Sequence, residues 1–411
     1  MNKLGLVVYQ VAKEEKMEKD PIVIAGIART PMGSFQGSLS SLTAPELGSV
    51  AIRSSLERSA IDPCDISEVI MGCVLPAGQG QAPARQASIK AGIPVDVGAT
   101  TINKMCGSGM KATMLGHDLI RAGSANIAVV GGLESMSNTP YLLPKARQGF
   151  RMGHAEVKDH MFLDGLEDAY DQGQLMGHFA ENTAEKYQFS REAQDDFAIR
   201  SLQRGKKANE DGSFDAEMVP VTVATRKGEN TVAQDEQPFL ANIEKIPTLK
   251  PAFRKNGTVT PANSSSISDG ASSMVLMRRS VADKRGVTPL AEIVAHSTFS
   301  QDPAWFTTAP VGAISSLFEK TGWSVRDVGL YEINEAFAVV TMAAIKEHGL
   351  DDDLVNIHGG ACAMGHPVGS SGSRIICTLV GAMHKYDVDK GVAALCIGGG
   401  EATAVAVQKV D

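Results

Sequence analysis

Short apolar runs recur along the chain, and longer amphipathic stretches separate them. The first run, Ile22 to Ile27, is rich in β-branched residues and is followed by Arg29-Thr30-Pro31, a pattern typical of a buried strand that ends in a turn. Comparable runs lie at 69–74, 127–130, 274–277, 290–295 and 392–397. Because strands buried on both faces alternate here with helical stretches, the pattern predicts an α/β fold whose parallel or mixed sheets carry helices on each side.

Two of the predicted strands resemble each other. Residues 126–134 and 391–401 each follow a predicted helix and end in glycines and a glutamate. A weaker similarity links Cys106-Gly-Ser-Gly with segment 365–372, because both open predicted helices. These similarities, about 265 residues apart, predict two related halves, although matches this short also arise by chance.

Residues 136–265 differ from the rest of the chain in composition and pattern. Charged residues, glycines and short amphipathic segments are mixed there, and no strong buried strand is predicted. Ser190 to Asn209 predicts one exposed helix, with Ala193, Phe197 and Leu202 on one face. We interpret the stretch as an insertion on the first half that carries surface and ligand contacts.

Composition narrows the class of protein. The chain has 411 residues, 43% of them apolar, which is ample for a large core and predicts two or three domains. Its formal net charge of −8 leaves no basic excess to hold a polyanionic backbone, so nucleic acid is not an expected partner. No run of 18 apolar residues occurs, so no membrane partner is expected either.

The N-terminal residues and the cysteines indicate in which cellular compartment the protein is expected. Residues 1–20 contain no arginine and lack the cleavage site of a secretory signal, and we interpret them as a leader outside the fold. The six cysteines form no Cys-x-x-Cys pair and no Cys/His cluster with zinc spacing, so reduced thiols and no metal site are expected. The predicted location is cytoplasmic.

Three segments combine glycine with reactive side chains. Cys106 precedes a Gly-Ser-Gly turn at a predicted helix N-terminus, where the helix dipole favours a thiolate nucleophile, although many cysteines are only small buried hydrophobes. His366 lies in a glycine-rich segment, 358–374, which predicts a fixed imidazole near a ligand or else a plain turn, while His358 is expected to be structural. Cys396 ends a predicted strand, the place where functional groups gather in α/β sheets.

A fourth segment, Tyr331 to Ala338, carries amides and carboxylates. These amides and carboxylates are able to orient a water or a histidine, and the alternative is that Asn334 caps a helix N-terminus. The glycines after Cys396 do not complete a G-x-G-x-x-G pattern because residue 403 is threonine, so a dinucleotide site is not favoured.

Together these segments strongly resemble the thiolase family from about residue 21 to the C-terminus. The matching motifs are N-x-x-C-G-S-G at 103–109, N-E-A-F-A at 334–338, G-G-A-x-x-x-G-H-P-x-G-x-S-G at 359–372 and C-x-G-G-G at 396–400. Segments 131–136, 180–184 and 256–260 resemble the short-chain acetoacetyl-CoA thiolases. The resemblance implies a five-layer αβαβα core of two similar halves, 21–285 and 286–411, with an inserted loop domain at about 136–265.

The resemblance also implies a role for each site residue. Cys106 matches the nucleophile that takes the acetyl group, His366 the base that activates it, and Cys396 the second acid/base. Asn334 matches the side chain that holds a water, which with His366 forms one oxyanion hole. The backbone N–H groups of Cys106 and Gly398 match the other.

Coenzyme A contacts are implied in the same way. Ser265 matches a serine that contacts the pantetheine arm, and four residues match the apolar lining of its tunnel: Met176, Phe253, Ala336 and Phe337. Four basic residues are candidates for the phosphates, although solvated side chains are the simpler interpretation: Arg226, Lys227, Lys245 and Lys250.

The implied activity is the reversible Claisen condensation of two acetyl-CoA to acetoacetyl-CoA and CoA through an acetyl-Cys106 thioester. Coenzyme A thioesters are then substrates, and no cofactor is bound permanently. The alternative is a degradative 3-ketoacyl-CoA thiolase for longer chains, and the bulk of Trp305-Phe306 is a candidate limit on acyl length. Resemblance further implies a homodimer or homotetramer.

Overall fold

The computed structural model describes residues 20–410, and the predicted leader at 1–20 lies outside the described residues except for Asp20. In this part of the chain ten strands form one hydrogen-bonded sheet, ordered β12-β13-β14-β11-β1-β10-β5-β3-β4, with β2 paired to β10. The strands are β1 (Ile22–Arg29), β2 (Gly33–Ser34), β3 (Glu68–Gly72), β4 (Gly98–Ile102), β5 (Ile127–Ser135), β10 (Ser268–Arg278), β11 (Ala291–Ser300), β12 (Leu330–Ile333), β13 (Lys390–Ile397) and β14 (Glu401–Lys409).

The two halves of this sheet have the same topology. In the first half β3 lies parallel to β4 and β5, and β10 runs antiparallel to β5 and β1. In the second half β12 lies parallel to β13 and to a single bridge at Val355, and β14 runs antiparallel to β13 and β11. Only two residue pairs, Val23 with Glu292 and Ile24 with Ala291, join β1 to β11. The predicted mixed sheet and its related halves are confirmed.

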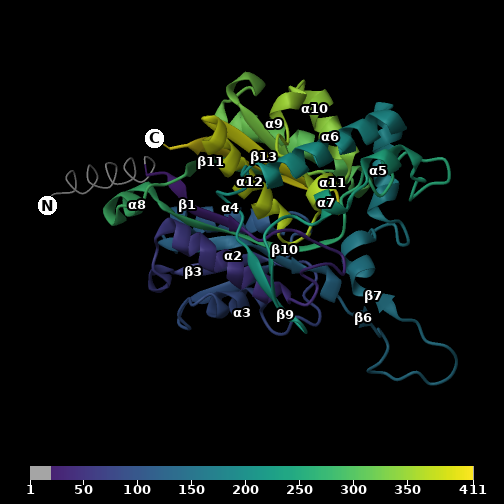
Figure 1. Ribbon diagram of the computed structural model, residues 1–411, viewed down its shortest axis with the longest axis horizontal. Helices are drawn as coiled ribbons and strands as arrows, with labels where there is room; N and C mark the ends of the chain where they lie inside the picture. The colour runs from purple at the N-terminus through teal and green to yellow at the C-terminus, as the bar shows by residue number, and fades with distance from the viewer. Residues whose placement is uncertain (1–19, 411) are drawn as a thin grey trace, which may run out of the picture.

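Six helices separate and enclose the two halves of the sheet (Figure 1). They are α2 (Ala44–Ser59), α3 (Pro83–Lys90), α4 (Ser108–Ala122), α9 (Ala309–Thr321), α10 (Ala338–His348) and α12 (Ser371–Tyr386). Helices α2 and α3 share one core with the outer face of the first half, and α9 and α10 share another with the outer face of the second. Helices α4 and α12 share the central core with both halves of the sheet. The result is the expected five-layer αβαβα arrangement.

Side-chain alternation assigns each strand to its two layers, because successive residues of a strand point to opposite faces. On β1, Val23 lies in the outer core of the first half and Ile24 in the central core. On β13, Leu395 lies in the central core and Ala394 in the outer core of the second half. Strands buried on both faces explain the continuous apolar runs in the sequence.

Helix boundaries follow from capping side chains. Thr43 and Glu46 form a reciprocal capping box at the start of α2. Helix α4 ends before Gly123, whose φ of 79° suits a glycine C-cap. Ser190 accepts a hydrogen bond from the N–H of Ala193 and starts α6 (Arg191–Glu210), so the helix predicted at 190–209 is confirmed. It is not an exposed helix, because eight of its residues are buried.

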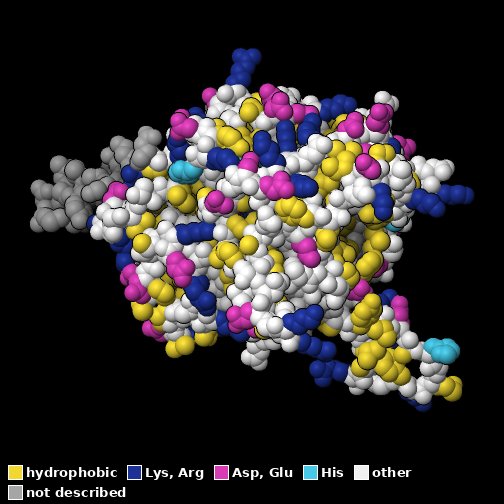
Figure 2. Space-filling model, viewed as in Figure 1, with side chains coloured by type: hydrophobic (Ala, Val, Ile, Leu, Met, Phe, Trp, Pro, Cys, Tyr) yellow, Lys and Arg dark blue, Asp and Glu magenta, His cyan; other side chains and the backbone are white. Residues whose placement is uncertain are grey.

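The stretch predicted as an insertion contains small elements that pack on both halves. They are η2 (Met136–Asn138), β6 (Tyr141–Leu142), β7 (Lys158–Asp159), η3 (Phe162–Leu166), α5 (Met176–Tyr187), α6, β8 (Val221–Thr225), β9 (Gly228–Val232), α7 (Gln237–Leu240) and η4 (Ile243–Thr248). Its hairpin β6-β7 extends from the body as an arm (Figure 1). Hydrophobic atoms, yellow in Figure 2, are exposed along this arm. The exposed apolar residues there are Tyr141, Leu143, Phe150, Met152 and Val157.

Short elements complete the described chain. They are η1 (Pro63–Asp65), α8 (Arg279–Arg285), η5 (Pro303–Thr308), η6 (Val325–Asp327), η7 (Asp352–Leu354) and α11 (Ala361–Met364). Within residues 20–410, no helix has the length and apolar character needed to cross a membrane.

The first turns of α4 and α12 meet with almost no side chain between them. A Cβ on Gly109 would lie 2.5 Å from Oγ of Ser373, and a Cβ on Gly372 would lie 2.4 Å from the backbone nitrogen of Met110. Such distances are shorter than van der Waals contact, so glycine is required at both positions. This contact fixes the segment before α4 against the segment before α12.

We expect Gly372→Ala to destabilise the protein by about 1–3 kcal/mol or more, because the new methyl group overpacks this helix contact. Gly381 lies on the same helix, and a Cβ there would meet only Cβ of Ala216 at 3.8 Å. Gly381→Ala is therefore the matched control, and it should be neutral or stabilising by up to about 1 kcal/mol. Denaturant unfolding of both variants measures the difference, and equal losses would contradict the close packing of α4 on α12.

Candidate active site

Cys106 lies on a tight turn between β4 and α4. The residue before it, Met105, has a φ of 46°, an uncommon value for a residue with a side chain. Oδ1 of Asn103 accepts from the N–H of Met105 at 2.8 Å. Oγ of Ser108 accepts from the N–H of Lys104 at 2.8 Å and donates to the Met105 carbonyl at 2.6 Å. These bonds hold the half-buried Cys106 at the N-terminal end of α4.

Backbone N–H groups surround the Cys106 thiol. Burial raises the pKa of Cys106 to about 11, while hydrogen bonds from the N–H groups of Gly398 and of Cys106 itself act in the opposite direction. The Cys106 turn is also tied to the second half, because Nζ of Lys104 lies 2.6 Å from Oε2 of Glu401. The structure thus brings together Cys106 and Gly398, which are 292 residues apart in the sequence.

His366 presents one free nitrogen in the segment between α11 and α12. Its Nδ1 lies 2.5 Å from Oγ of Ser371, and that hydroxyl donates to the Pro367 carbonyl at 3.1 Å. The hydroxyl oxygen therefore accepts the Nδ1–H, which leaves Nε2 as the unprotonated nitrogen. Nε2 is buried without a hydrogen-bond partner. Burial lowers the pKa of His366 to about 3, and the charge of Arg374 adds to this effect. The ring is a neutral proton acceptor.

Cys396 and Asn334 complete the group from β13 and the end of β12. Cys396 is fully buried, and burial together with the nearby Cys106 raises the pKa of its thiol well above the usual range. The backbone N–H of Asn334 donates to the Ala394 carbonyl at 3.0 Å. Both side-chain amide atoms of Asn334 are buried without a protein partner, a state that proteins satisfy with ordered water or ligand. Helix α10 starts at Ala338 after Phe337, so the helix-cap alternative for Asn334 is wrong.

Two buried glutamates anchor the segments of the site, and no anchoring role was predicted for either of them from the sequence. Glu134, at the end of β5, accepts from the N–H groups of Val74, Leu75 and Gly369 at 2.9, 3.1 and 2.9 Å. Burial raises the pKa of Glu134 to about 7 against these bonds. Glu335 accepts from three groups in the same way: Ser201 Oγ, Asn356 Nδ2 and Cys362 N–H. For Glu134 the sequence did offer a signal, because this residue follows the glycines at the end of the first of the two similar strands, 126–134.

The residues predicted to contact coenzyme A meet beside Cys396. Met176, Phe253, Ala336 and Phe337 lie in the same apolar cluster as Cys396. The rings of Phe253 and Phe337 pack edge to face with centroids 6.1 Å apart. Ser265 is fixed to this cluster, because its N–H donates to the Ala336 carbonyl at 2.9 Å. A Cβ on Gly398 would lie 3.5 Å from Sδ of Met176. The cluster forms an apolar wall next to the thiols.

The basic candidates do not join this cluster. Arg226 and Lys227 are exposed on the β8-β9 hairpin, whose buried residue Val223 packs in the outer core of the first half. Lys245 and Lys250 are exposed as well. The geometry favours solvated side chains at all four positions.

Two further sequence predictions are tested by packing. The ring of His358 is buried against Phe214 with centroids 5.5 Å apart, burial lowers its pKa to about 4, and a structural role fits these contacts. Phe306, in η5, lies in the apolar cluster with Cys396. Trp305 instead contacts Lys186, whose Nζ lies 4.4 Å from the ring centroid. Phe306 is therefore the bulky residue beside the site.

Comparisons with known proteins match this geometry over nearly the whole chain. Residues 22–280 match the family "Thiolase, N-terminal domain" and residues 287–409 match "Thiolase, C-terminal domain". The chain is 48% identical to the acetyl-CoA acetyltransferase of Cupriavidus necator, over 94% of this chain and 99% of that protein. It is 47% identical to the cytosolic acetyl-CoA acetyltransferase of Mus musculus, over 95% of this chain and 98% of that protein.

A solved structure extends the match to three dimensions. The crystal structure of the Acat5 thiolase from Ascaris suum in complex with coenzyme A superposes with a TM-score of 0.90 at 41% identity, and the match spans 95% of this chain and 100% of that one. The two family models and this solved structure agree with the two-halved αβαβα core. The chain belongs to the thiolase family.

Proposed function

We propose that the protein is an acetyl-CoA C-acetyltransferase, which condenses two acetyl-CoA reversibly to acetoacetyl-CoA and CoA. The observation that carries the proposal is the proximity of two thiols, Cys106 and Cys396, of which Cys396 lies in the apolar cluster. The buried Nε2 of His366, which has no hydrogen-bond partner, supports the proposal as a candidate base. Relatives at 47–48% identity are named acetyl-CoA acetyltransferases, which supports the same reaction. Coenzyme A thioesters are the substrates, and no permanently bound cofactor is needed.

The first half-reaction uses Cys106 and His366. Nε2 of His366 takes the thiol proton as the sulfur of Cys106 attacks the carbonyl carbon of acetyl-CoA. The N–H groups of Cys106 and Gly398 stabilise the oxyanion, and loss of one such donor costs about 10²–10³ in rate. When the C–S bond to coenzyme A breaks, His366 returns its proton to the departing CoA thiolate. The product is acetyl-Cys106.

The second half-reaction uses Cys396 and Asn334. A thioester α-carbon is a very weak acid, so its deprotonation needs a strong base and a stabilised enolate oxygen. The thiolate of Cys396 takes the α-proton of the second acetyl-CoA, and a water held by Asn334 acts with His366 on the enolate oxygen. The carbanion attacks the acetyl carbon, and Cys106 leaves as a thiolate. Cys396 then passes the α-proton to Cys106, which restores both the Cys106 thiol and the Cys396 thiolate for the next cycle.

The apolar cluster supports binding of the pantetheine arm. Met176, Phe253, Ala336 and Phe337 provide a wall for an uncharged chain, and Ser265 offers a hydroxyl at its edge. The anionic end of coenzyme A would lie outside this cluster.

The alternative is a degradative 3-ketoacyl-CoA thiolase for longer chains. Phe306 favours the short-chain reaction, because its ring occupies space in the cluster that holds Cys396. Thiolysis rates for a series of 3-ketoacyl-CoA chain lengths, combined with acetyl-CoA labelling and peptide mapping, test the proposal. We expect a label on Cys106 and the highest kcat/KM with acetoacetyl-CoA. A large preference for longer chains would select the alternative.

We further propose a cytoplasmic homodimer or homotetramer. All six cysteines are free thiols, as expected in a reducing compartment. The apolar side chains exposed on the β6-β7 arm, such as Met152 at 97% exposure, favour contact with another copy.

A further inference from the structure

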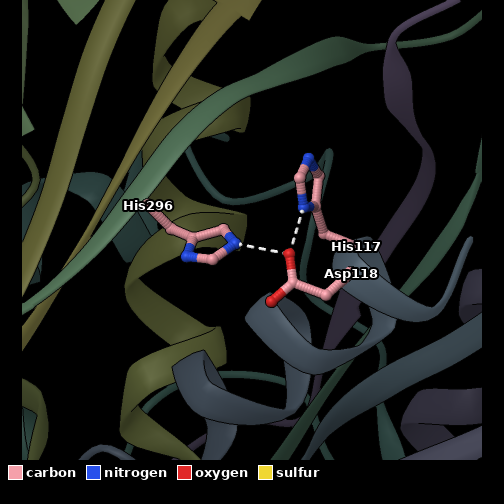
Figure 3. A group of neighbouring side chains, drawn as sticks. All are labelled: His117, Asp118 and His296. Atoms are coloured by element: carbon pink, nitrogen blue, oxygen red, sulfur yellow. Dashed lines mark hydrogen bonds and ion pairs between the residues drawn. The ribbon is translucent and has the colours of Figure 1, made fainter. Parts of the chain in front are cut away.

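Two histidines and an aspartate meet between the two halves of the protein, away from the thiols. His117 and Asp118 lie in the third turn of α4, and His296 lies on β11 (Figure 3). Oδ1 of Asp118 is 3.0 Å from Nδ1 of His117 and 2.9 Å from Nε2 of His296. The two rings stand edge to face with centroids 5.1 Å apart. Rings from two elements, one of them 178 residues from Asp118 in sequence, thus each bring one nitrogen to the same carboxylate oxygen.

The spacing of these atoms fits one small cation. Zn²⁺ binds imidazole nitrogen and carboxylate oxygen at about 2.0–2.2 Å, so neighbouring ligand atoms around a tetrahedral ion lie about 3.3 Å apart. One nitrogen from each histidine and one carboxylate oxygen here all lie within 4.8 Å of one another. The Asp118 side chain is 53% exposed, which leaves room for an ion to enter from solvent and to keep water as a fourth ligand.

The simpler interpretation is a hydrogen-bonded trio in which both rings donate to Asp118. That arrangement uses a single carboxylate oxygen for two donors and needs no ion. The facing nitrogens of His117 and His296 are nevertheless placed to act as metal ligands. When the proton on each facing nitrogen moves to the other nitrogen of the same ring, both facing nitrogens present a lone pair toward Asp118. Imidazole with a carboxylate suits zinc, copper and nickel better than magnesium or calcium, which prefer all-oxygen sites.

The charged residues around His117, Asp118 and His296 affect how tightly a cation binds there. Asp118 supplies the negative charge, while Arg121 on the same helix acts on His117 as an opposing positive charge. Nζ of Lys320 is directed to the His296 carbonyl at 2.8 Å. Binding of a divalent cation therefore depends on the Asp118 carboxylate.

We propose that His117, Asp118 and His296 form a binding site for a divalent transition-metal ion of the zinc class, which fastens α4 of the first half to β11 of the second. The ion takes no part in the thioester chemistry. It ties the helix that starts two residues after Cys106 to the sheet of the other half. The site departs from the sequence expectation of no metal, because its ligands come from distant segments.

Titration calorimetry of chelator-treated protein with ZnCl₂, at neutral pH, tests the proposal. We expect one Zn²⁺ per chain, and binding at least about 100-fold weaker in Asp118→Asn and in His296→Asn. Loss of a residue that only hydrogen-bonds to a metal ligand already lowers metal affinity by about 10–100-fold, and these two residues are themselves the proposed ligands. Both variants alter side chains that reach solvent. His154→Ala, at an exposed histidine outside the group, is the matched control and should bind as the unaltered protein does.

Co²⁺ identifies the ligand type independently of folding defects. Nitrogen and oxygen ligands give visible d–d bands without the near-ultraviolet charge-transfer band of cobalt thiolate. We expect that spectrum in the unaltered protein, its loss in Asp118→Asn, and its retention in Cys106→Ser. A thiolate band, or equal Zn²⁺ affinity in the unaltered protein and Asp118→Asn, would overturn the proposal.

Discussion

Replacing Cys106 by alanine is expected to abolish the acetyl-enzyme and to lower turnover by at least about 10⁴-fold. The acetyl group then has no sulfur to which it is transferred, and loss of a nucleophile removes the whole covalent pathway rather than one stabilising contact. The His366 ring would remain in place, because its Nδ1 is held by Oγ of Ser371 and not by the Cys106 side chain. Intact-protein mass spectrometry after incubation with acetyl-CoA and a steady-state condensation assay measure both effects.

The control for this variant is another accessible thiol. Cys64 is exposed in η1, far along the chain from the site motifs, and Cys64→Ala should keep both the acetyl label and turnover. A label that persists in Cys106→Ala, or one that maps to Cys64, would show that the covalent intermediate forms elsewhere. Turnover within tenfold of the unaltered protein would exclude Cys106 as the nucleophile.

The strands predicted from apolar runs include β1, β5 and β10, which are buried on both faces, and two of the missed strands differ from them physically. Strand β4 lies at the sheet edge and is only partly buried, so its Gly-Ala-Thr-Thr-Ile sequence has no apolar run. Strand β14 is buried but rich in alanine, which has a weak strand preference. Its pairing with β13 follows from a tight glycine turn, since Gly399 and Gly400 have φ of 93° and 87°.

For the site, too, the features that depend on a few neighbouring residues were predictable, and those that join distant segments were not. Cys106, His366, Cys396 and Asn334 each lie in a motif of a few residues, so the sequence alone predicted all four. Contacts between motifs were not predictable, because they join segments far apart in the chain. The bond from the Gly369 N–H to Glu134 spans 235 residues. The helix-cap alternative for Asn334 failed for a related reason, since the link from β12 to α10 extends to Phe337.

Cys396→Ala should separate the two half-reactions. Without this thiol no base reaches the α-carbon, so exchange of the α-protons of acetyl-CoA and condensation should each fall by about 10²–10⁴-fold. Acetylation of Cys106 should persist within tenfold, because that step uses His366. His366→Ala is the contrasting variant, and it should slow acetylation itself. Solvent-deuterium incorporation into acetyl-CoA and mass spectrometry of the acetyl-enzyme measure the two steps separately.

The alternative role for Cys396 is packing, because its side chain is buried in the cluster with Phe337 and Met176. Cys377 is the matched control, since it is an equally buried thiol on α12 whose pKa burial also raises. Cys377→Ala should alter stability and leave the ratio of the two half-reactions unchanged. If Cys396→Ala lowered acetylation and exchange together, as a general loss of packing would, the base assignment would be wrong. A selective loss of exchange requires a group that acts on the α-proton, and a raised thiol pKa suits that task because a weaker acid gives a stronger base.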